Sequence, residues 1–299
     1  MENNIINASV NGKTTVLGII GCPVTHSFSP IIHNTIANMN KENTVYVPFE
    51  PKPEELSEAV EGAFALKIKG LNVTVPHKVN VMKYLYDVDK KALSIGAVNT
   101  LKYTEKGYVG YNTDIIGVKY SLEKYGFDIK NKKVLILGAG GASNACTAMA
   151  ASEEAKKIYI ANRTLSKAQN LKENINKYYD TDIDVLNISD TDNIDNVDIV
   201  INCTTMGFGD KKDQTPIENK NFFKEKNVQL VFDAIYTPWE TRLLKEASQA
   251  GVNTLNSFDM LIYQAIAAQE IWFDKKIDTF TSDTLKNTLS QYYRGNSNE

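Results

Sequence analysis

The sequence has few of the residues that mark metal-binding, disulfide-bonded or secreted proteins. It contains three cysteines and three histidines in 299 residues, and Cys22, Cys146 and Cys203 lie far apart in the chain. Such spacings match neither a disulfide framework nor a zinc-ligand pattern, so we expect a reducing compartment and no bound metal. No apolar run approaches the roughly 20 residues of a membrane-spanning helix. The first residues also lack the basic region and apolar core of a secretory signal.

An excess of positive charge is also absent. The 33 Lys and Arg residues are outnumbered by 36 Asp and Glu residues, which gives a formal net charge of -3. A nucleic-acid-binding surface or a polybasic membrane patch needs an excess of Lys and Arg, so the composition argues against both. Hydrophobic residues make up 42% of the chain, enough for a sizeable core, and the length suggests two domains. We therefore expect a soluble cytoplasmic protein.

What the sequence does contain is an apolar strand that ends in a glycine-rich turn. Residues 133–137 are Lys-Val-Leu-Ile-Leu, and Gly138 and Gly140 follow before a run of small residues. A continuous apolar run is typical of a parallel strand buried on both faces. The glycines allow backbone N–H groups at a helix start to bind a pyrophosphate. They fill the first two places of the dinucleotide-binding fingerprint, whereas Ser143 stands where the third glycine is usual. Taken alone, such a turn can also be a plain connection.

The next predicted strand favours NADP over NAD. Residues 157–161 read as that strand, and Asn162, Arg163 and Thr164 follow it before a helical pattern. Proteins that bind NAD place an acidic residue here for the ribose 2′-hydroxyl, whereas an Arg accommodates the 2′-phosphate of NADP. No acidic residue follows this strand, and Lys167 adds a second cation one helical turn beyond Arg163. Ordinary surface charges at a helix start are the alternative interpretation.

Alternating strand and helix patterns predict an α/β protein. In residues 1–112 they indicate an open α/β domain, which binds ligands at the carboxyl ends of its strands. Residues 113–257 carry the glycine-rich turn and predict a Rossmann domain. No strand pattern follows Asn256, so we expect the helical segments within 258–299 to pack back on the first domain.

Polar side chains gather near the predicted strand ends of the first domain. Ser27 and Ser29 lie in a loop before a helix, where hydroxyl donors and the helix N-terminus suit a carboxylate. Lys78 falls in the first turn of a predicted helix, where the helix dipole disfavours a cation and so favours proton transfer. Asn99 and Asp114 accompany two further strand patterns. Each also has an ordinary explanation, since Ser29 and Asp114 can cap helices and a single Lys is usually solvated.

Taken together, these motifs resemble those of the shikimate dehydrogenase family. They recur in the family's order over nearly the whole chain, as GCPVTHSFSP (21–30), NVTVPHK (72–78), GAVNTL (96–101), YNTD (111–114), GAGGAS (138–143), NRT (162–164), YTPWETRLL (236–244) and MLIYQ (260–264). The resemblance implies a substrate domain and an NADP-binding Rossmann domain. It also implies NADPH-dependent reduction of 3-dehydroshikimate to shikimate, in chorismate and aromatic amino acid biosynthesis.

The resemblance further implies a role for individual residues. Lys78 and Asp114 would form the catalytic pair, with Lys78 exchanging a proton with the substrate oxygen at C3 while hydride moves to or from the nicotinamide. The charge of Asp114 favours Lys78 as the ammonium, which opposes the dipole effect, so the sequence leaves the protonation state of Lys78 open. The implied substrate contacts are Ser27, Ser29, Thr74, Asn99, Tyr236 and Gln264. The implied cofactor contacts are Gly138, Ala139, Gly140, Gly141, Ala142, Ser143, Asn162, Arg163, Thr164, Lys167, Thr204, Met206 and Met260.

Two other functions stay open at this point. A quinate/shikimate dehydrogenase of the same superfamily would accept more substrates or NAD, and Arg163 argues against it. A non-catalytic protein that binds NADP or shikimate would keep the fold without turnover, and the presence of both Lys78 and Asp114 argues against that. One departure from the family is Asp259, where many members have Gly. The sequence does not choose between a monomer and a homodimer.

Overall fold

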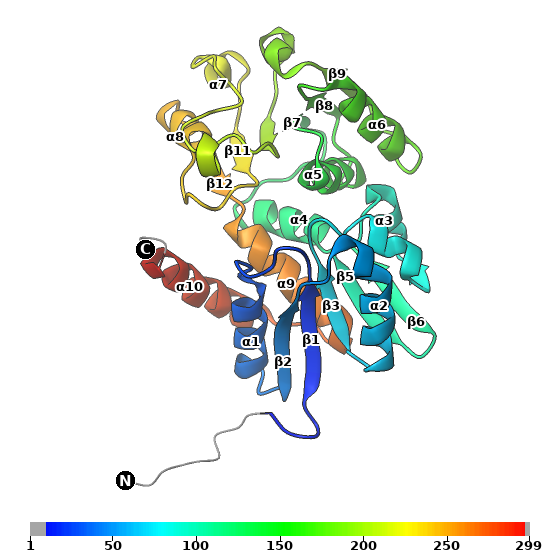
Figure 1. Cartoon of the computed structure of the whole chain (residues 1–299). Coiled ribbons are helices and arrows are strands. Elements are labelled where there is room, and N and C mark those ends of the chain that lie inside the picture. Colours follow the sequence, from blue (N-terminus) through cyan, green and yellow to red (C-terminus); the bar gives the residue numbers. More distant parts are fainter. Residues whose placement is uncertain (1–9, 297–299) are drawn as a thin grey trace. The chain divides into compact units, whose positions relative to one another are not determined.

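The computed structural model describes residues 10–296, which divide into two compact units. The first unit holds the described residues up to Leu93, Ala97–Thr113 and the residues from Ala265 onward. The second unit holds Ser94–Gly96 and Asp114–Gln264. The chain therefore leaves the first unit and returns to it, as the blue-to-cyan and the orange-to-red segments of Figure 1 show.

The boundaries between the two units differ by a few residues from the predicted domain limits. The sequence predicted limits at 112/113 and 257/258, whereas the units change between Thr113 and Asp114 and between Gln264 and Ala265. The second change falls inside a single helix, α9 (Phe258–Phe273). Residues 1–9 and 297–299, which the prediction also included, lie outside the described residues.

The first unit is built on a mixed sheet of six strands. Parallel pairing joins β1 to β2 and to β3, whereas β5 pairs antiparallel with β3 and with β6. The strand order is β2 (Thr44–Phe49), β1 (Thr15–Ile20), β3 (Gly70–Val73), β5 (Thr100–Thr104), β6 (Gly107–Tyr111) and β4 (Asp87–Val88). The other elements of this part of the chain are α1 (Ser29–Met39), α2 (Leu56–Ala65), α3 (Lys90–Ile95), α10 (Thr279–Asn296) and the short 3₁₀ helices η1 (Pro53–Glu55) and η2 (Asn80–Tyr84).

Both faces of this sheet are covered, because side chains alternate along β1. Ile20 packs in a core with α2 and β3. Leu17 and Ile19 point the other way and pack against Trp272 of α9. The Trp272 indole is fully buried and donates from Nε1 to the Leu101 carbonyl oxygen at 2.8 Å. A side chain at Gly70 would collide with the Trp272 ring, so glycine is required beneath it.

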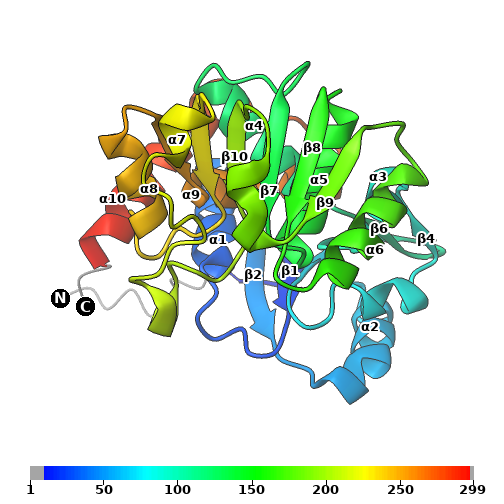
Figure 2. The same cartoon turned by 90° about the horizontal axis from the view of Figure 1, so that it is seen from above.

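The second unit is a Rossmann fold. Its sheet is parallel throughout, with the order β12 (Asn253–Asn256), β11 (Leu230–Asp233), β10 (Ile199–Asn202), β7 (Lys133–Leu137), β8 (Lys157–Ala161) and β9 (Ile183–Leu186). Counted along the chain this is the 3-2-1-4-5-6 order of dinucleotide-binding sheets, which reverses between β7 and β10. Figure 2 shows β10, β7, β8 and β9 side by side. The predicted α/β class with a C-terminal Rossmann unit is confirmed.

Helices of the second unit follow the strands, as the alternating pattern predicts. The sequence predicts helices over 113 to about 125, after the glycine-rich turn and over 165–178, and the structure forms α4 (Asp114–Lys124), α5 (Gly141–Ser152) and α6 (Leu165–Asn176) there. Four short elements of the chain had not been predicted, namely β4, α3, α7 (Phe222–Glu225) and α8 (Arg242–Gln249). The 3₁₀ helices η3 (Ile188–Asn193) and η4 (Gly209–Lys211) had not been predicted either. These elements have two to eight residues, which is shorter than the window in which a hydrophobic period can be recognised, so their sequences resemble loops.

A buried carboxyl group, that of Asp233, ends β11. Its Oδ2 accepts a hydrogen bond from Thr241 Oγ1 at 2.6 Å, and its Oδ1 accepts from Asn202 Nδ2 at 2.9 Å and from Ile235 N at 3.1 Å. Burial raises the pKa of Asp233 from 3.8 to about 6, and the three donors offset only part of this effect. The folded protein therefore holds a proton on Asp233 at pH values where the unfolded chain has lost it.

We expect Asp233 to contribute stability below about pH 4 that is lost as the pH rises through about 6. Between these values only the folded state binds the proton, and a difference of that size corresponds to about 3 kcal/mol. Asp233→Asn should remove this contribution, which urea unfolding of both proteins across the pH window would measure. Asp128→Asn, at an exposed carboxylate, is the control. A difference in unfolding free energy between wild type and Asp233→Asn that does not change with pH would contradict the prediction.

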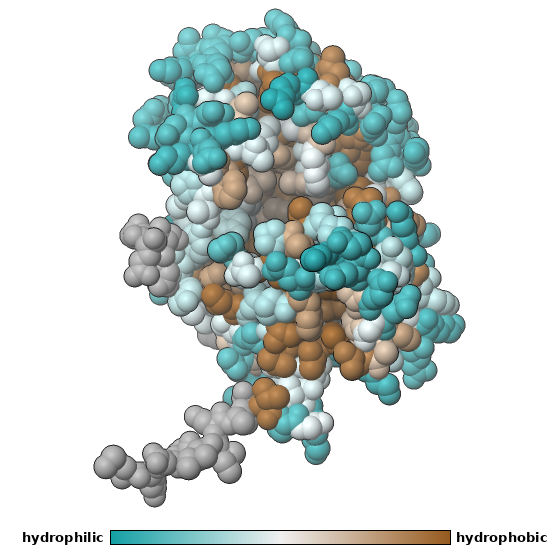
Figure 3. Space-filling view, viewed as in Figure 1, coloured by the Kyte–Doolittle hydropathy of each residue, from teal (hydrophilic) through white to brown (hydrophobic). Residues whose placement is uncertain are grey.

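The surface over α6, α7 and α8 is largely hydrophilic (teal in Figure 3). Exposed large apolar side chains include Leu165 at the start of α6, and Leu66 and Val75 in the first unit. Among residues 10–296, no helix has the length and apolar character to cross a membrane.

Candidate active site

One edge of the first sheet brings together the predicted substrate contacts of that unit. The ends of β1 and β3 lie side by side, since Ile20 pairs with Val73. The start of β5 lies at the same edge because β5 runs antiparallel to β3, and Val73 N donates to Asn99 O at 2.8 Å. The end of β6 joins them, since Tyr111 pairs with Thr100. The loops that hold Ser27, Ser29, Thr74, Lys78 and Asn99 all start or end here.

The serine loop connects β1 to α1. Ser29 is the first residue of α1 and is buried, while Phe28 occupies the N-cap position without a side-chain cap. The expectation that Ser29 caps this helix is therefore wrong. Ser27 takes part of that role, because its Oγ accepts a hydrogen bond from Ser29 N at 3.3 Å. Phe28 between the two serines packs against Tyr292 and Tyr293 of α10, with ring centroids 6.2 and 5.5 Å away.

Lys78 lies in a turn after β3. The predicted helix from His77 is wrong at its start, because residues 75–79 form turns and a 3₁₀ helix begins only at Asn80. Lys78 therefore precedes the short helix η2 and does not lie in a first helical turn, where the dipole argument for its chemistry had placed it. Instead, the turn is fixed by Val98 N, which donates to Lys78 O at 2.8 Å, and by the buried His77, whose Nε2 lies 3.0 Å from Pro51 O. Lys78 itself is half-buried.

Thr74 is held at the β3 end by its backbone. Its N–H donates to Ile20 O at 2.8 Å, and its carbonyl accepts from His77 N at 2.9 Å. A side chain at Gly21 would collide with the Thr74 methyl group, so the first glycine of the serine loop allows the two loops to approach.

Asn99 is buried and its amide orientation is fixed. Its Oδ1 accepts hydrogen bonds from Thr113 N at 2.8 Å and from Thr100 Oγ1 at 2.9 Å. A backbone N–H only donates, so the atom that faces it must be the amide oxygen. Asp114 follows Thr113 in the chain and is the half-buried first residue of α4, where a helix N-terminus stabilises an anion.

The predicted cofactor site of the second unit lies where the strand order reverses. The glycine-rich turn follows β7, and Cys203 N at the end of β10 donates to Leu137 O at 2.8 Å. Gly138 has a φ of 106° and lies against the Cys203 backbone, so no other residue fits there easily. Side chains at Gly140 or Gly141 would meet nothing within 4 Å. A glycine turn with open space at a helix N-terminus is the arrangement that binds a pyrophosphate.

The residue in the place of the third glycine supports this turn from inside. Ser143 is fully buried, and its Oγ accepts a hydrogen bond from Gly140 N at 3.2 Å. Its side chain thus faces the protein, whereas Ala139 and Ala142 beside it are half-buried. The serine stabilises the turn and leaves the glycine positions open.

The end of β8 carries the predicted adenosine contacts. Arg163, Thr164 and Lys167 are exposed, and Thr164 is the N-cap residue of α6. Asn162 is half-buried and its Nδ2 donates to Thr164 O at 2.9 Å, which shapes the turn. Two cations at this strand end, with no acidic residue among 161–167, fit a 2′-phosphate.

The other predicted residues of the second unit fall into two groups. Thr204 follows β10, with Oγ1 2.8 Å from Asn202 Oδ1, and its Oγ1 accepts from Met206 N at 3.2 Å. Met260 and Gln264 lie on α9, which packs so closely on α4 that a side chain at Gly117 would collide with the Met260 carbonyl oxygen. Gln264 is buried, and its Nε2 donates to Leu261 O at 2.9 Å. The half-buried Tyr236 packs edge-on against Phe258, with ring centroids 6.5 Å apart.

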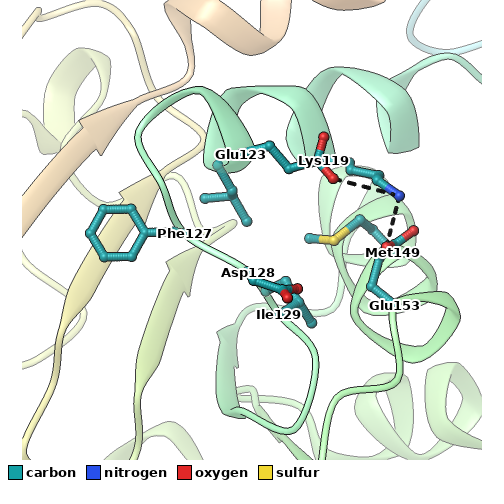
Figure 4. A pocket seen from close by; sticks show the side chains of 8 residues that line it. Lys119, Glu123, Phe127, Asp128, Ile129, Met149 and Glu153 are labelled. Atoms are coloured by element: carbon teal, nitrogen blue, oxygen red, sulfur yellow. Dashed lines mark hydrogen bonds and ion pairs between the residues drawn. The ribbon is translucent and has the colours of Figure 1, made fainter.

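A small pocket of the second unit, drawn in Figure 4, includes Met149 and Glu153 from the C-terminal end of α5, whereas the glycine-rich turn lies at the N-terminal end of that helix. Its lining residues are Lys119, Leu122, Glu123, Phe127, Asp128, Ile129, Met149 and Glu153. Lys119 Nζ lies 2.8 Å from Glu153 Oε2 and 3.7 Å from Glu123 Oε1, and the hydrogen bond to Glu153 raises the pKa of Lys119. No predicted site residue lines this pocket, so we assign it no part in binding substrate or cofactor. Within the described part of the chain, no cluster of three His, Cys, Asp or Glu residues is placed to hold a metal ion.

Sequence reasoning gave no role to the polar residues behind Asn99. Asn72, Thr100 and Thr113 are buried and hydrogen-bonded to Asn99 or to one another. Their signal in the sequence was polar amides and hydroxyls within strand patterns that otherwise bury apolar residues.

Comparison with known proteins gives one consistent family. Residues 19–101 match the family model described as shikimate dehydrogenase substrate binding domain, and residues 121–229 match the one described as shikimate / quinate 5-dehydrogenase. A relative from Methanocaldococcus jannaschii, named shikimate dehydrogenase (NADP(+)), is 45% identical over 267 residues. The match covers 88% of this chain and 93% of that relative.

Two solved structures are also similar to this chain. Shikimate 5-dehydrogenase from Listeria monocytogenes, in complex with shikimate and NAD, has a TM-score of 0.89 and 33% identity, over 96% of this chain and 100% of that chain. A shikimate dehydrogenase in complex with NADP+ has a TM-score of 0.83 and 40% identity, over 93% of this chain and 96% of that chain. The resemblance that the motifs indicated is thus confirmed, and the chain belongs to the shikimate dehydrogenase family.

Proposed function

We propose that the protein is an NADP-dependent shikimate dehydrogenase, which reduces 3-dehydroshikimate to shikimate and catalyses the reverse oxidation. The observation that carries this proposal is the gathering of the serine loop, Lys78 and Asn99 at one edge of the first sheet, in a chain of this family. The substrate is a small hydroxylated ring acid, which offers a carboxylate, hydroxyls and one carbonyl to such a site.

The serine loop would bind the substrate carboxylate. Hydroxyl groups donate to carboxylate oxygens, and the start of α1 adds backbone N–H donors. The Asn99 amide nitrogen donates one hydrogen to Thr113 Oγ1 at 3.1 Å and would donate the other to a ring oxygen, since its amide oxygen accepts from Thr113 N and Thr100. Thr74, Tyr236 and Gln264 would complete the substrate contacts, as the family resemblance implies.

Lys78 would act as the proton donor during reduction. As the C3 carbonyl becomes a hydroxyl, its oxygen takes a proton from the Lys78 ammonium, and the resulting amine regains a proton from solvent. In the oxidation direction Lys78 takes the hydroxyl proton instead. Asp114 would favour the ammonium form of Lys78 through its negative charge.

NADPH, when bound, supplies the hydride. The turn formed by residues 138–143 would hold its pyrophosphate, and Asn162, Arg163, Thr164 and Lys167 would hold the adenosine end with its 2′-phosphate. Thr204, Met206 and Met260 would lie along the rest of the cofactor. The name of the Methanocaldococcus jannaschii relative supports NADP as the cofactor. The three cysteines are free, which supports work in the reducing cytoplasm.

The test is to offer the purified protein shikimate or quinate with NADP or NAD, in all four pairings, and to follow the absorbance of the reduced nicotinamide. Turnover with shikimate and NADP alone would support the proposal. Comparable rates with quinate or NAD would replace it with the broader quinate/shikimate activity. Binding without turnover in any pairing would leave a non-catalytic binding protein.

A further inference from the structure

Four buried side chains form a hydrogen-bonded chain across the sheet of the first unit, from Tyr46 on β2 to Asn99. Tyr46 reaches past β1, and its hydroxyl donates to Asn72 Oδ1 on β3 at 2.8 Å. Asn72 Nδ2 lies 3.2 Å from Thr100 Oγ1, and Thr100 Oγ1 lies 2.9 Å from Asn99 Oδ1. The exposed fraction is 6% or less for each of these residues.

Backbone atoms fix the direction of every hydrogen bond in this chain. Asn72 Nδ2 also lies 3.2 Å from the Asn99 carbonyl oxygen, which only accepts, so the Asn72 amide oxygen must face Tyr46. The Thr113 backbone N–H, which only donates, places Oδ1 of Asn99 toward Thr100 in the same way. The Thr100 hydroxyl accepts from Asn72, and it donates to Asn99 because an amide oxygen only accepts. All donors thus run in one sense, from Tyr46 to Asn99.

The Tyr46 end of the chain is rigid and keeps its proton. The His33 ring stacks on the Tyr46 ring, with centroids 4.2 Å apart and an interplanar angle of 8°. His33 Nδ1 in turn lies 3.0 Å from Gln269 Nε2. Burial raises the pKa of Tyr46 well above its ordinary value, and a hydrogen bond with Ser29 offsets only part of this. Burial also lowers the pKa of His33 to about 3, so the stacked ring is neutral near pH 7.

We propose that Tyr46 is a positioning residue for substrate binding, which acts through Asn72 and Thr100 to hold the Asn99 amide with its nitrogen as the donor to a substrate oxygen. This inference rests on the proposed function, because it assigns Asn99 to the substrate. Hydrogen bonds that point in one sense polarise one another, so the chain also strengthens Asn99 as a donor. Tyr46 does not itself touch the substrate in this scheme.

The test compares Tyr46→Phe with Tyr108→Phe. Tyr108 is a matched control, because it lies on β6 of the same sheet, is 2% exposed and donates its hydroxyl to Ile68 O at 2.6 Å. Both variants lose one buried hydroxyl and keep the ring, and Tyr46→Phe also loses the hydrogen bond with Ser29, an effect that the double-mutant cycle below separates from the route through Asn99. Tyr46→Phe should raise the KM for shikimate about threefold to tenfold, the effect of one hydrogen bond, and leave the KM for NADP unchanged. Tyr108→Phe should change neither KM, although both variants should unfold at lower temperature.

A double-mutant cycle decides whether Tyr46 acts through Asn99. In an Asn99→Ala background, Tyr46→Phe should cause no further change in the KM for shikimate. The amide that the hydrogen-bonded chain positions is absent from that background. Full additivity would overturn the inference, as would an unchanged KM in Tyr46→Phe or an equal change in Tyr108→Phe. Thr100→Val, which breaks the same chain, replaces Tyr46→Phe if that variant does not fold. A wild type that does not oxidise shikimate overturns the proposed function and this inference with it. Turnover in the wild type with no effect of Tyr46→Phe overturns the inference alone.

Discussion

Lys78→Ala is expected to lower kcat for shikimate oxidation about a hundredfold to ten-thousandfold, the usual contribution of a positioned proton-transfer group. The loss should be confined to the chemical step. The turn that carries Lys78 is fixed by its backbone carbonyl, which accepts from Val98 N, and by the buried His77. The substitution removes the amine and leaves these contacts in place.

Steady-state kinetics in both directions and NADP titration would measure this effect. The KM for NADP should hardly change, because the predicted cofactor residues belong to the second unit and Lys78 to the first. Lys83→Ala is the control, since Lys83 lies in the adjacent η2 and donates to Asn80 Oδ1 at 3.3 Å, on the surface. Lys78→Arg separates charge from proton transfer, because an Arg stays protonated. Near wild-type activity in Lys78→Arg would reject the proton-transfer role, and loss of NADP binding in Lys78→Ala would reject its place on the substrate side.

Arg163→Ala is expected to raise the KM for NADP about tenfold to a hundredfold and to leave the KM for NAD nearly unchanged. A hydrogen bond to a charged group contributes about 1.5 to 3 kcal/mol, and only NADP carries the 2′-phosphate that would receive it. The exposed Arg163 follows β8 in a turn braced by Asn162, so its removal costs little stability.

Initial rates with each cofactor at saturating shikimate would give the two KM values. Arg242→Ala is a useful control, because that guanidinium belongs to α8 and its Nε lies 2.8 Å from Glu246 Oε1. It should leave both values unchanged. Lys167→Ala should show the same preference as Arg163→Ala with a smaller effect. An equal rise in the KM for NADP and in the KM for NAD in Arg163→Ala would show that Arg163 does not bind the 2′-phosphate.

The Rossmann unit was predictable because its signals are local. The apolar strand before Gly138, the small residues after it and the cations at 163 and 167 are each read from a few consecutive residues. The strand order 3-2-1-4-5-6 then places the glycine-rich turn and Thr204 at the point of reversal. Ser143 was predicted as a cofactor contact, and only the structure shows its side chain turned inward beneath Gly140.

The turn at Lys78 was less predictable because distant residues determine it. Pro76 followed by an amphipathic pattern is typical of a helix start. In the structure the turn instead depends on Val98 and Pro51, which hydrogen-bond to Lys78 O and His77 Nε2. The Tyr46–Asn99 chain was unpredictable for the same reason, since it joins strands that are neighbours or near neighbours only through the sheet order β2-β1-β3-β5.

The packing of Trp272 against Gly70 and the apolar face of β1 has a consequence for synthesis of the protein on the ribosome. The residues between Thr113 and Trp272 take about 10 to 30 seconds to synthesise. During that time the apolar face formed by Leu17 and Ile19 lacks the helix that buries it in the finished protein. The second unit is nearly continuous in the chain and ends at Gln264 within this helix, so its whole sheet is synthesised before Trp272. Chaperones would therefore be needed while the first unit is synthesised but Trp272 is not. A chain that stalls in this interval would aggregate through the uncovered apolar face.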